Sequence, residues 1–158
     1  MDEHSIRRYD GDREALRPLF READDSEQQI DSYLDLGDVL VAEHGDQIIG
    51  HLQLITDHET AELNSMAVAA NQRGTGVGRA LMQAAIEYSR QQAATRLLVA
   101  TATADIGNLR FYQRQGFRFL RVERDVFGTA TGYPDNHLID GIPLRDRVWL
   151  DRDLGGES

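Results

Sequence analysis

The chain has 158 residues, of which 41% are hydrophobic and 28% are charged. This length and composition predict one globular domain that buries about 70% of its unfolded surface and folds without a metal or disulfide. A net charge of −10 without a basic patch argues against nucleic acid as a partner. No apolar run approaches the ~20 residues that cross a membrane, so a membrane is not expected as a partner.

The missing residue types exclude several chemistries. The chain has no cysteine and no lysine, since all 17 of its basic residues are arginine. Neither a thioester nor a Schiff base can therefore form on a side chain of the protein. No G-x-S-x-G motif marks a serine nucleophile, and the five histidines lack metal-ligand spacing. The lack of cysteine and the polar, acidic N-terminal segment predict a cytoplasmic protein. The spacing of the histidines predicts that no metal is bound.

The N-terminal part of the chain predicts strands interrupted by two helices. Asp12 is expected to cap a helix that runs to residue 23, and Ser26 a second helix that stops at Gly37. Apolar residues at strand spacing recur in four segments. These predicted strands are residues 5–9, 39–43, 47–55 and 61–69.

The C-terminal part predicts two more helices and three more strands. The helical segments are residues 77–92 and residues 105–114, the second capped by Asp105 and ended by Gly116. The strand segments are residues 96–103, 117–127 and 142–150, with a loop at 128–141 and a flexible tail at 151–158. The order β-α-α-β-β-β-α-β-α-β-β predicts a single α/β domain, residues 1–150, with helices on a mixed sheet.

Residues 71–81, N-Q-R-G-T-G-V-G-R-A-L, form a glycine run between a strand-like and a helix-like segment. Such a run exposes backbone N–H groups at the positive end of a helix, where a diphosphate binds without lysine. The P-loop motif is excluded because no lysine exists, and the dinucleotide fingerprint because Arg79 replaces its last glycine. A glycine-rich turn without a ligand is the alternative interpretation.

Three blocks, in this order and at this spacing, resemble the GCN5-related N-acetyltransferase (GNAT) family. They are E-L-N-S-M-A-V at residues 62–68, R-G-T-G-V-G-R-A-L-M at 73–82 and F-Y-Q-R-Q-G-F at 111–117. The resemblance extends over about residues 39–119 and fits the predicted element order of the whole chain. It implies the GNAT acyl-CoA N-acyltransferase fold, acetyl-CoA as co-substrate, and direct acetyl transfer to a primary amine.

The resemblance also implies which residues bind the coenzyme. The strand holding Met66, Ala67 and Val68 would splay from its neighbour and bind the pantetheine arm through its backbone. The glycine loop would bind the pyrophosphate, through Arg73, Gly74, Thr75, Gly76, Val77, Gly78 and Arg79. The family often has Asn where this chain has Asp105, so Asn108 can replace that pantetheine contact, and Asp105 can equally be a helix cap only.

Two catalytic roles follow from the same resemblance. Tyr112 would protonate the leaving thiolate, for which a phenol of pKa ~10 is well matched. Glu62 would take the amine proton, directly or through water, and strand alternation places it with Asn64 and Met66 unless a bulge intervenes. Weaker candidates for the base are Glu59, His58 and His51.

The acceptor site is expected between the first two helices and the 128–141 loop. Acidic residues there would suit a small cationic amine: Asp24, Asp25, Glu27, Asp135 and Asp140. These carboxylates can also be ordinary surface acids. A protein N-terminal or lysine acetyltransferase and a non-enzymatic acyl-CoA-binding module remain alternative functions. A homodimer is plausible by analogy with the family.

Overall fold

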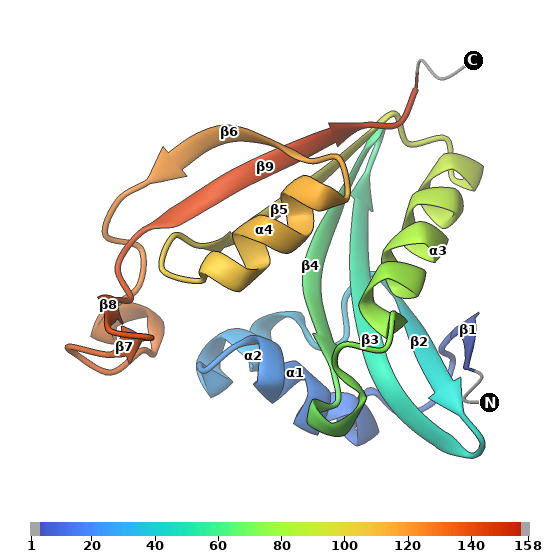
Figure 1. Cartoon of the computed structure of the whole chain (residues 1–158), viewed down its shortest axis with the longest axis horizontal. Coiled ribbons are helices and arrows are strands. Elements are labelled where there is room, and N and C mark those ends of the chain that lie inside the picture. Colours follow the sequence, from blue (N-terminus) through green and yellow to red (C-terminus); the bar gives the residue numbers. More distant parts are fainter. Residues whose placement is uncertain (1–3, 156–158) are drawn as a thin grey trace.

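The computed structural model describes residues 4–155 and is built on a seven-stranded sheet in the order β1-β2-β3-β4-β5-β9-β6 (Figure 1). Its strands are β1 (Ser5–Arg8), β2 (Asp38–His44), β3 (Gln47–Asp57), β4 (Thr60–Val68), β5 (Arg96–Ala102), β6 (Arg118–Glu123) and β9 (Arg147–Asp153). Neighbouring strands are antiparallel except for β4 and β5, which are parallel. The predicted mixed α/β class is therefore confirmed.

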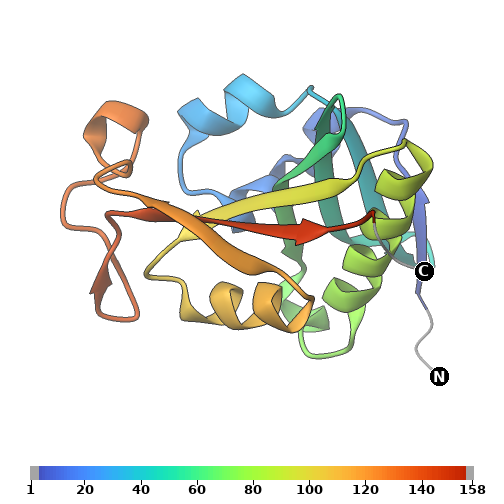
Figure 2. The ribbon, with the colours of Figure 1, turned by 90° about the horizontal axis from the view of Figure 1, so that it is seen from above.

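Helices cover both faces of the sheet (Figure 2). Helices α3 (Val77–Gln91) and α4 (Ile106–Arg114) pack on one face, and α1 (Arg17–Ala23) and α2 (Glu27–Tyr33) on the other. Strand β2 shows the alternation that produces two cores. Its Leu40 belongs to the cluster beneath α3, whereas its Val39 and Val41 belong to the cluster beneath α1 and α2.

The order of the long elements agrees with the sequence prediction, and so do the helix caps. The side chain of Asp12 accepts a hydrogen bond from the Glu14 amide, and that of Ser26 from the Gln29 amide. The first predicted helix is divided into a 3-10 turn, η1 (Arg13–Leu16), and α1, with a proline in the first turn of α1.

The prediction was wrong about the C-terminal region in four places. The strand expected at residues 117–127 ends at Glu123. The expected loop contains a 3-10 turn, η3 (Thr129–Thr131), and a hairpin of β7 (Leu138–Ile139) with β8 (Ile142–Pro143). The last long strand therefore begins at Arg147 rather than at residue 142. It continues to Asp153, and Leu154 is buried, so the chain is packed where the tail was expected to begin. Residues 156–158 of that expected tail lie outside the described residues.

Candidate active site

A cleft of about 590 Å³ opens in the middle of the sheet, where β4 and β5 separate. The two strands pair only over four residues, from Thr60 with Arg96 to Leu63 with Val99. Both strands continue past that point, β4 to Val68 and β5 to Ala102. Figure 1 shows the two strands diverging. The edge of β4 that faces β5 is therefore unpaired within the sheet beyond Leu63.

A β-bulge at Asn64 sets which side chains of β4 face the cleft. Strand β3 pairs Leu54 with Leu63 and Gln53 with Ser65, so Asn64 is the extra residue. The Nδ2 atom of Asn64 donates to Oε1 of Gln53 at 2.9 Å. The bulge also separates Met66 from the face of Glu62, because Met66 packs in the cluster beneath α3. The alternation that places Met66 on the face of Glu62 therefore ends at the bulge, which is the exception that the prediction allowed.

The glycine loop leads from the end of β4 into α3. Gly74 and Gly76 have φ angles of +79° and +90°, which explains why glycine stands at both positions. A Cβ atom built at either residue would have no heavy atom within 4 Å. Gly76 is the N-cap of α3 and supplies no side chain, so the first amides of the helix have neither a side-chain cap nor an intrahelical acceptor. This arrangement can bind an anion.

The two arginines of the loop differ in their surroundings. The guanidinium of Arg73 donates to Oε1 of Glu22 at 2.8 Å and to the carbonyl oxygen of Val68 at 3.1 Å. Arg73 thus ties the loop to α1 and to the end of β4, rather than standing open to a phosphate. Arg79 is exposed in the first turn of α3.

Tyr112 is a buried phenol at the wall of the cleft. Its side chain is 6% exposed and lies edge-on to the rings of Phe111 and Phe117, with centroids 5.4 and 5.7 Å away. Burial raises the pKa of Tyr112 above its ordinary value, and the negative charge of Asp105 raises it further. The phenol is protonated at neutral pH, as a general acid must be, and the raised pKa makes it a weaker acid than an ordinary phenol.

Asp105 acts as the N-cap of α4. Its side chain accepts a hydrogen bond from the Asn108 amide at 3.0 Å, as the sequence predicted for a helix cap. The side-chain amide of Asn108 donates to Oγ1 of Thr101 on β5 at 3.1 Å. Both residues line the cleft beside Tyr112.

Glu62 is a half-buried carboxylate in the cleft. Burial raises the pKa of Glu62, and the positive charge of Arg147 partly opposes that increase. A carboxylate with a raised pKa is a stronger base than an exposed one. Asn64 and Ser65 lie on the same strand and also line the cleft.

The weaker base candidates are less suitable. His51 is fully buried, shares a 2.8 Å hydrogen bond with Oγ of Ser65, and lies 4.2 Å from the ring of Phe20. Burial lowers the pKa of His51 to about 3, so it is neutral and weakly basic. His58 and Glu59 are exposed at the β3–β4 turn and are not among the residues that line the cleft.

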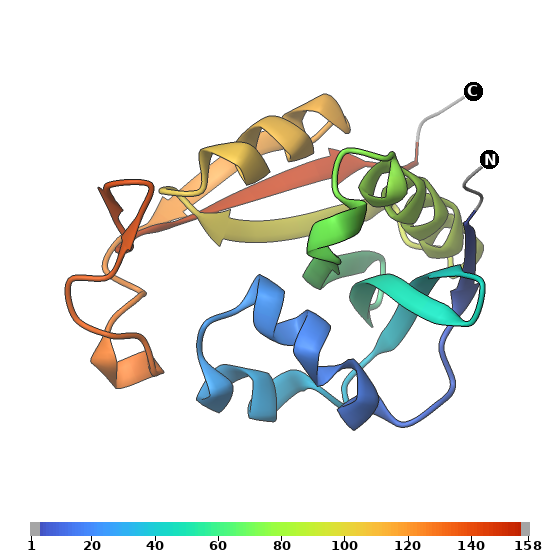
Figure 3. The same cartoon turned by 60° about the horizontal axis from the view of Figure 1, so that its bottom comes forward.

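On the other side, residues of the corner between α1 and α2 and of the segment after β6 line the cleft, and the two segments face one another in Figure 3. The Asp24 carboxylate accepts hydrogen bonds from the hydroxyls of Tyr33 and Tyr133, at 2.8 and 2.6 Å. The hydroxyl of Ser26 donates to the carbonyl oxygen of Thr131 at 3.0 Å. The bonds of Tyr133 and Ser26 hold the segment after β6 against the α1–α2 corner, and Asp24, Tyr33 and Tyr133 line the cleft.

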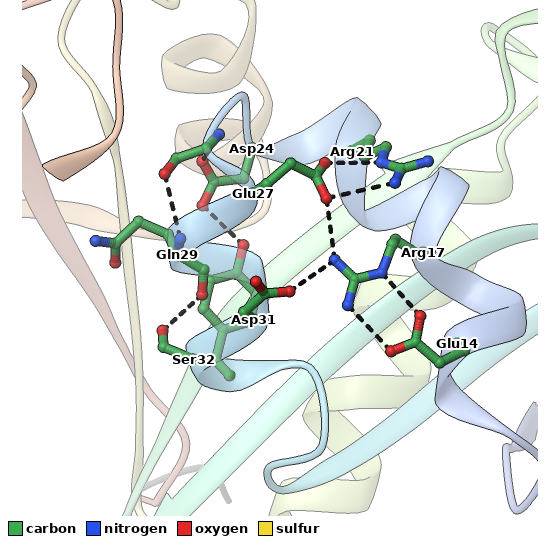
Figure 4. Close-up of polar contacts among 10 residues, drawn as sticks. Glu14, Arg17, Arg21, Asp24, Glu27, Gln29, Asp31 and Ser32 are labelled. Atoms are coloured by element: carbon green, nitrogen blue, oxygen red, sulfur yellow. Dashed lines mark hydrogen bonds and ion pairs between the residues drawn. The ribbon is translucent and has the colours of Figure 1, made fainter. Parts of the chain in front are cut away.

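Salt bridges fix the α1–α2 corner itself (Figure 4). Arg17 is 15% exposed and contacts the carboxylates of Glu14, Glu27 and Asp31 at 2.9 to 3.0 Å. Glu27 also pairs with Arg21 at 2.7 Å. Glu27 therefore stabilises the packing of the two helices and does not line the cleft.

Of the five acids expected at the acceptor site, Asp24 and Asp25 line the cleft, whereas Asp135 and Asp140 are exposed outside it. Several other cleft residues escaped the sequence prediction. These are Tyr33, Arg147 and Trp149. Tyr33 has the spacing of a core residue in its helix, and the other two gave no pattern that indicates a site. Tyr133 lines the cleft and belongs to the 128–141 loop that was expected at the acceptor site.

Two other kinds of feature are absent from residues 4–155. No group of three or more His, Cys, Asp or Glu side chains there is placed to hold a metal ion. In the same residues, no helix combines the length and hydropathy needed to span a bilayer.

Comparisons with known proteins agree with this geometry. The model of the family described as "Acetyltransferase (GNAT) family" matches residues 8–117. The N-acetyltransferase YvbK of Bacillus subtilis (strain 168), itself uncharacterised, is 32% identical over 140 residues, which cover 88% of this chain and 89% of the relative.

Two solved structures have nearly the same fold. The IAA acetyltransferase from Bacillus cereus ATCC 14579 superposes with a TM-score of 0.85 at 31% identity, covering 96% of this chain and 99% of that protein. A GNAT family acetyltransferase from Elizabethkingia anophelis, solved with acetyl-CoA bound, has a TM-score of 0.88 at 28% identity and covers 97% and 99%.

Proposed function

The chain belongs to the GNAT family of acetyltransferases, and on that premise we propose that it acetylates the primary amine of a small cationic acceptor. It is an acetyl-CoA-dependent N-acetyltransferase of mixed α/β fold. We also propose roles for single residues and a binding mode for the coenzyme.

The observation that carries the proposal is the unpaired edge of β4 beside the uncapped N-terminus of α3. The backbone of Met66, Ala67 and Val68 would pair with the amide groups of the pantetheine arm. The amides of the glycine loop would bind the pyrophosphate, from Gly74 and Thr75 through Gly76, Val77 and Gly78 to Arg79. Arg73 would either leave Glu22 for a phosphate or keep the loop in place through its present contacts.

The reaction needs a neutral amine and a leaving thiol. A lysine-like ammonium of pKa ~10.4 is only about 0.04% neutral at pH 7, which costs roughly 4–5 kcal/mol. Glu62 would remove that proton, directly or through a water. The amine nitrogen then attacks the thioester carbon, and a backbone N–H near Val68 stabilises the oxyanion. The carbon–sulfur bond breaks as Tyr112 gives its proton to the thiolate. The second proton of the attacking nitrogen passes through water to the phenolate of Tyr112, and Glu62 releases the first proton to solvent.

The acidic residues that line the cleft favour a small cationic acceptor. Glu22, Asp24, Asp25 and Glu62 all line it, and the chain carries a net charge of −10. The bonds from Tyr133 to Asp24 and from Ser26 to Thr131 hold the segment after β6 against the α1–α2 corner on this side of the cleft. A segment held there would leave less room for a peptide.

The test is release of free thiol from acetyl-CoA, screened against small amines, peptide N-termini and lysine peptides. The proposal expects small cationic amines to raise release well above background hydrolysis, and peptides to leave it near background. A peptide that is the better acceptor, by kcat/KM, would instead favour the alternative of a protein acetyltransferase. The cytoplasmic location stays a prediction.

A further inference from the structure

Acids are numerous in the lining of the cleft, yet a cation lies among them on the acceptor side. Among residues 4–155, two positively charged side chains line the cleft, Arg73 and Arg147. Arg73 lies in the glycine loop and pairs with Glu22. Arg147 belongs to β9, and its side chain is 36% exposed, so a bound molecule can reach it. A site for a purely cationic acceptor would gain nothing from this guanidinium, since like charges repel.

The register of the sheet places Arg147 on the same face as Glu62. Leu98 of β5 pairs with Glu62 of β4, and Ala102, four residues further along β5, pairs with Arg147 of β9. Cross-strand partners share a face of a sheet, and so do residues an even number apart in one strand. The positive charge of Arg147 also opposes the rise in the pKa of Glu62, which agrees with two groups that lie across one cleft from each other.

Small side chains leave room beside Arg147. Ala100 pairs with Trp149 and Ala102 with Arg147, and all four residues line the cleft. The methyl groups of the alanines are much shorter than the indole and the guanidinium beside them. The guanidinium carbon of Arg147 lies 5.4 Å from the centre of the Trp149 ring. An apolar floor, made of the two alanines and the indole, therefore extends up to the guanidinium.

The hydrogen bonds of Arg147 leave part of its guanidinium for a ligand. Its Nε and Nη2 atoms both donate to the same atom, Oε1 of Glu123, at 2.8 and 2.6 Å. The indole nitrogen of Trp149 donates to that oxygen as well, at 2.8 Å. The Nη1 atom of Arg147 makes no hydrogen bond with any residue from 4 to 155. Glu123 thus fixes the direction of the guanidinium, while the two N–H groups of Nη1 stay available.

Glu123 does not neutralise the charge around it. Hydrogen bonds from Trp149 and then from Arg147 lower the pKa of Glu123, so its carboxylate is ionised at neutral pH. Its Oε2 atom lies 3.6 Å from Nη1 of Arg121, whose guanidinium carbon is 5.1 Å from the centre of the indole ring. Two arginines therefore share one carboxylate, and the cluster keeps an excess of positive charge. A guanidinium is well matched to a carboxylate, which it binds through parallel N–H groups.

We propose that the acceptor carries a carboxylate in addition to its amine, and that Arg147 binds this carboxylate. The inference rests on the proposed function and narrows its acceptor to an amino carboxylate. The reacting amine lies at Glu62, the carboxylate at Nη1 of Arg147, and the carbon chain between them on the apolar floor. A diamino acid suits both kinds of charge in the cleft, because its second amine meets the acids of the α1–α2 corner and the molecule stays a cation.

Acceptors that differ by one carboxylate test this assignment. Lysine and cadaverine form one such pair, and ornithine and putrescine form another that is one methylene shorter. Charge alone would favour the diamines in an acidic cleft, because each of them carries two positive charges. The proposal expects the opposite, with kcat/KM for thiol release at least tenfold higher for the amino acid of a pair. Diamines that match or exceed their amino acids in both pairs would overturn it, while their turnover would leave the proposed function standing.

Arg147→Gln tests whether Arg147 causes the preference. Glutamine keeps a donor for Glu123 and removes the charge. The kcat/KM for the amino acid should fall at least tenfold, and that for the diamine should not fall. The matched control is Arg118→Gln, which removes the charge of an exposed arginine on β6 outside the cleft. It should keep the preference of wild type. An equal loss for both members of a pair in Arg147→Gln would indicate a structural role alone and would overturn the proposal.

A binding experiment makes the test independent of turnover. Trp149 is the only tryptophan of the chain, so its indole N–H gives a single NMR signal at the proposed subsite. With CoA added, hexanoate should move this signal saturably, and hexanol, which has the same chain without the charge, should not. The effect of hexanoate should be lost in Arg147→Gln and kept in Arg118→Gln. No effect of hexanoate, or an equal effect of hexanol, would contradict the subsite even where an amine is acetylated.

Discussion

Tyr133 donates a hydrogen bond from its phenolic oxygen to Oδ1 of Asp24 at 2.6 Å, and so joins two segments that are 109 residues apart. Tyr33 donates to the other oxygen of the same carboxylate at 2.8 Å. Burial, followed by contacts with Asp24, raises the pKa of both phenols, which keeps them as donors. One carboxylate thus joins α2 and the segment after β6 beside the cleft.

Tyr133→Phe is predicted to weaken the contact between the segment after β6 and the α1–α2 corner. It removes a hydrogen bond to a charged group, which typically contributes about 1.5–3 kcal/mol. We expect a lower Tm and a raised KM for the amine, with the KM for acetyl-CoA unchanged. The control is Tyr88→Phe, whose phenol donates to Oδ2 of Asp38 at 2.8 Å outside the cleft. It should lose similar stability without any change in the KM for the amine, and an equal rise in that KM would contradict the assignment.

Tyr112→Phe is predicted to lower kcat while leaving the fold intact. The ring contacts with Phe111 and Phe117 remain, and only the buried hydroxyl is lost. Loss of a general acid typically costs about 10²–10⁴-fold in rate. Steady-state thiol release should show that loss in kcat with the KM for acetyl-CoA within about twofold, the pattern of a group that acts in the transition state. An unchanged kcat would remove Tyr112 from the chemistry.

Glu62→Gln is predicted to lower activity and to raise stability at neutral pH. Burial raises the pKa of Glu62 above that of the unfolded chain, so its ionised form is disfavoured by folding. The stability that this group contributes is present at low pH and is lost as pH rises through its folded pKa. The glutamine variant should therefore have a higher Tm than wild type above that pKa and no such gain below it.

The kinetic result for the same variant has its own control. In wild type, kcat/KM should fall as pH drops through the raised pKa of Glu62, because a protonated carboxyl is no base. Glu62→Gln should lose that acidic limb along with most of its activity. Glu59→Gln changes an exposed carboxylate on the neighbouring turn and should keep the wild-type profile. An acidic limb that persists in Glu62→Gln would assign the base to another group.

His51 is predicted to make the fold sensitive to acid. Burial lowers its pKa from 6.5 to about 3, so the unfolded chain takes up a proton at a higher pH than the folded chain does. Stability is fully present above the unfolded pKa and is lost as pH falls toward the folded value. Chemical denaturation of His51→Gln should show a shallower decline of stability with acid than wild type. The stability of His58→Gln, a change at an exposed histidine, should decline with acid as that of wild type does. The same decline in His51→Gln would contradict this prediction.

Local features of the fold were predictable from the sequence. Asp12, Ser26 and Asp105 cap helices as their spacing indicates, because a capping bond spans only two or three residues. The glycine loop lies where its run of residues predicts, since Gly74 and Gly76 have positive φ angles.

The shape of the acceptor side was not predictable, because it depends on contacts between distant residues. The pairing of Arg73 with Glu22 joins positions 51 residues apart, and no local pattern indicates it. The bulge at Asn64 depends on the register of β3 against β4 rather than on either strand alone. Tyr33 faces Asp24 and the cleft, although the spacing of its helix reads only as a core position.

Calorimetric titration of CoA and acetyl-CoA tests the central claim, which is that the backbone of the glycine loop binds the anionic part of the coenzyme. Gly76→Ala and Gly45→Ala are a matched pair, because both glycines have positive φ angles and open space where a Cβ would lie. Each variant should lose about 1–2 kcal/mol of stability through backbone strain.

For each of the two ligands, Gly45→Ala is predicted to bind with the affinity of wild type. Gly76→Ala is predicted to bind each ligand at least tenfold more weakly than wild type does. No heat of binding for either ligand with folded wild-type protein, or equal affinity in all three proteins, would contradict the account.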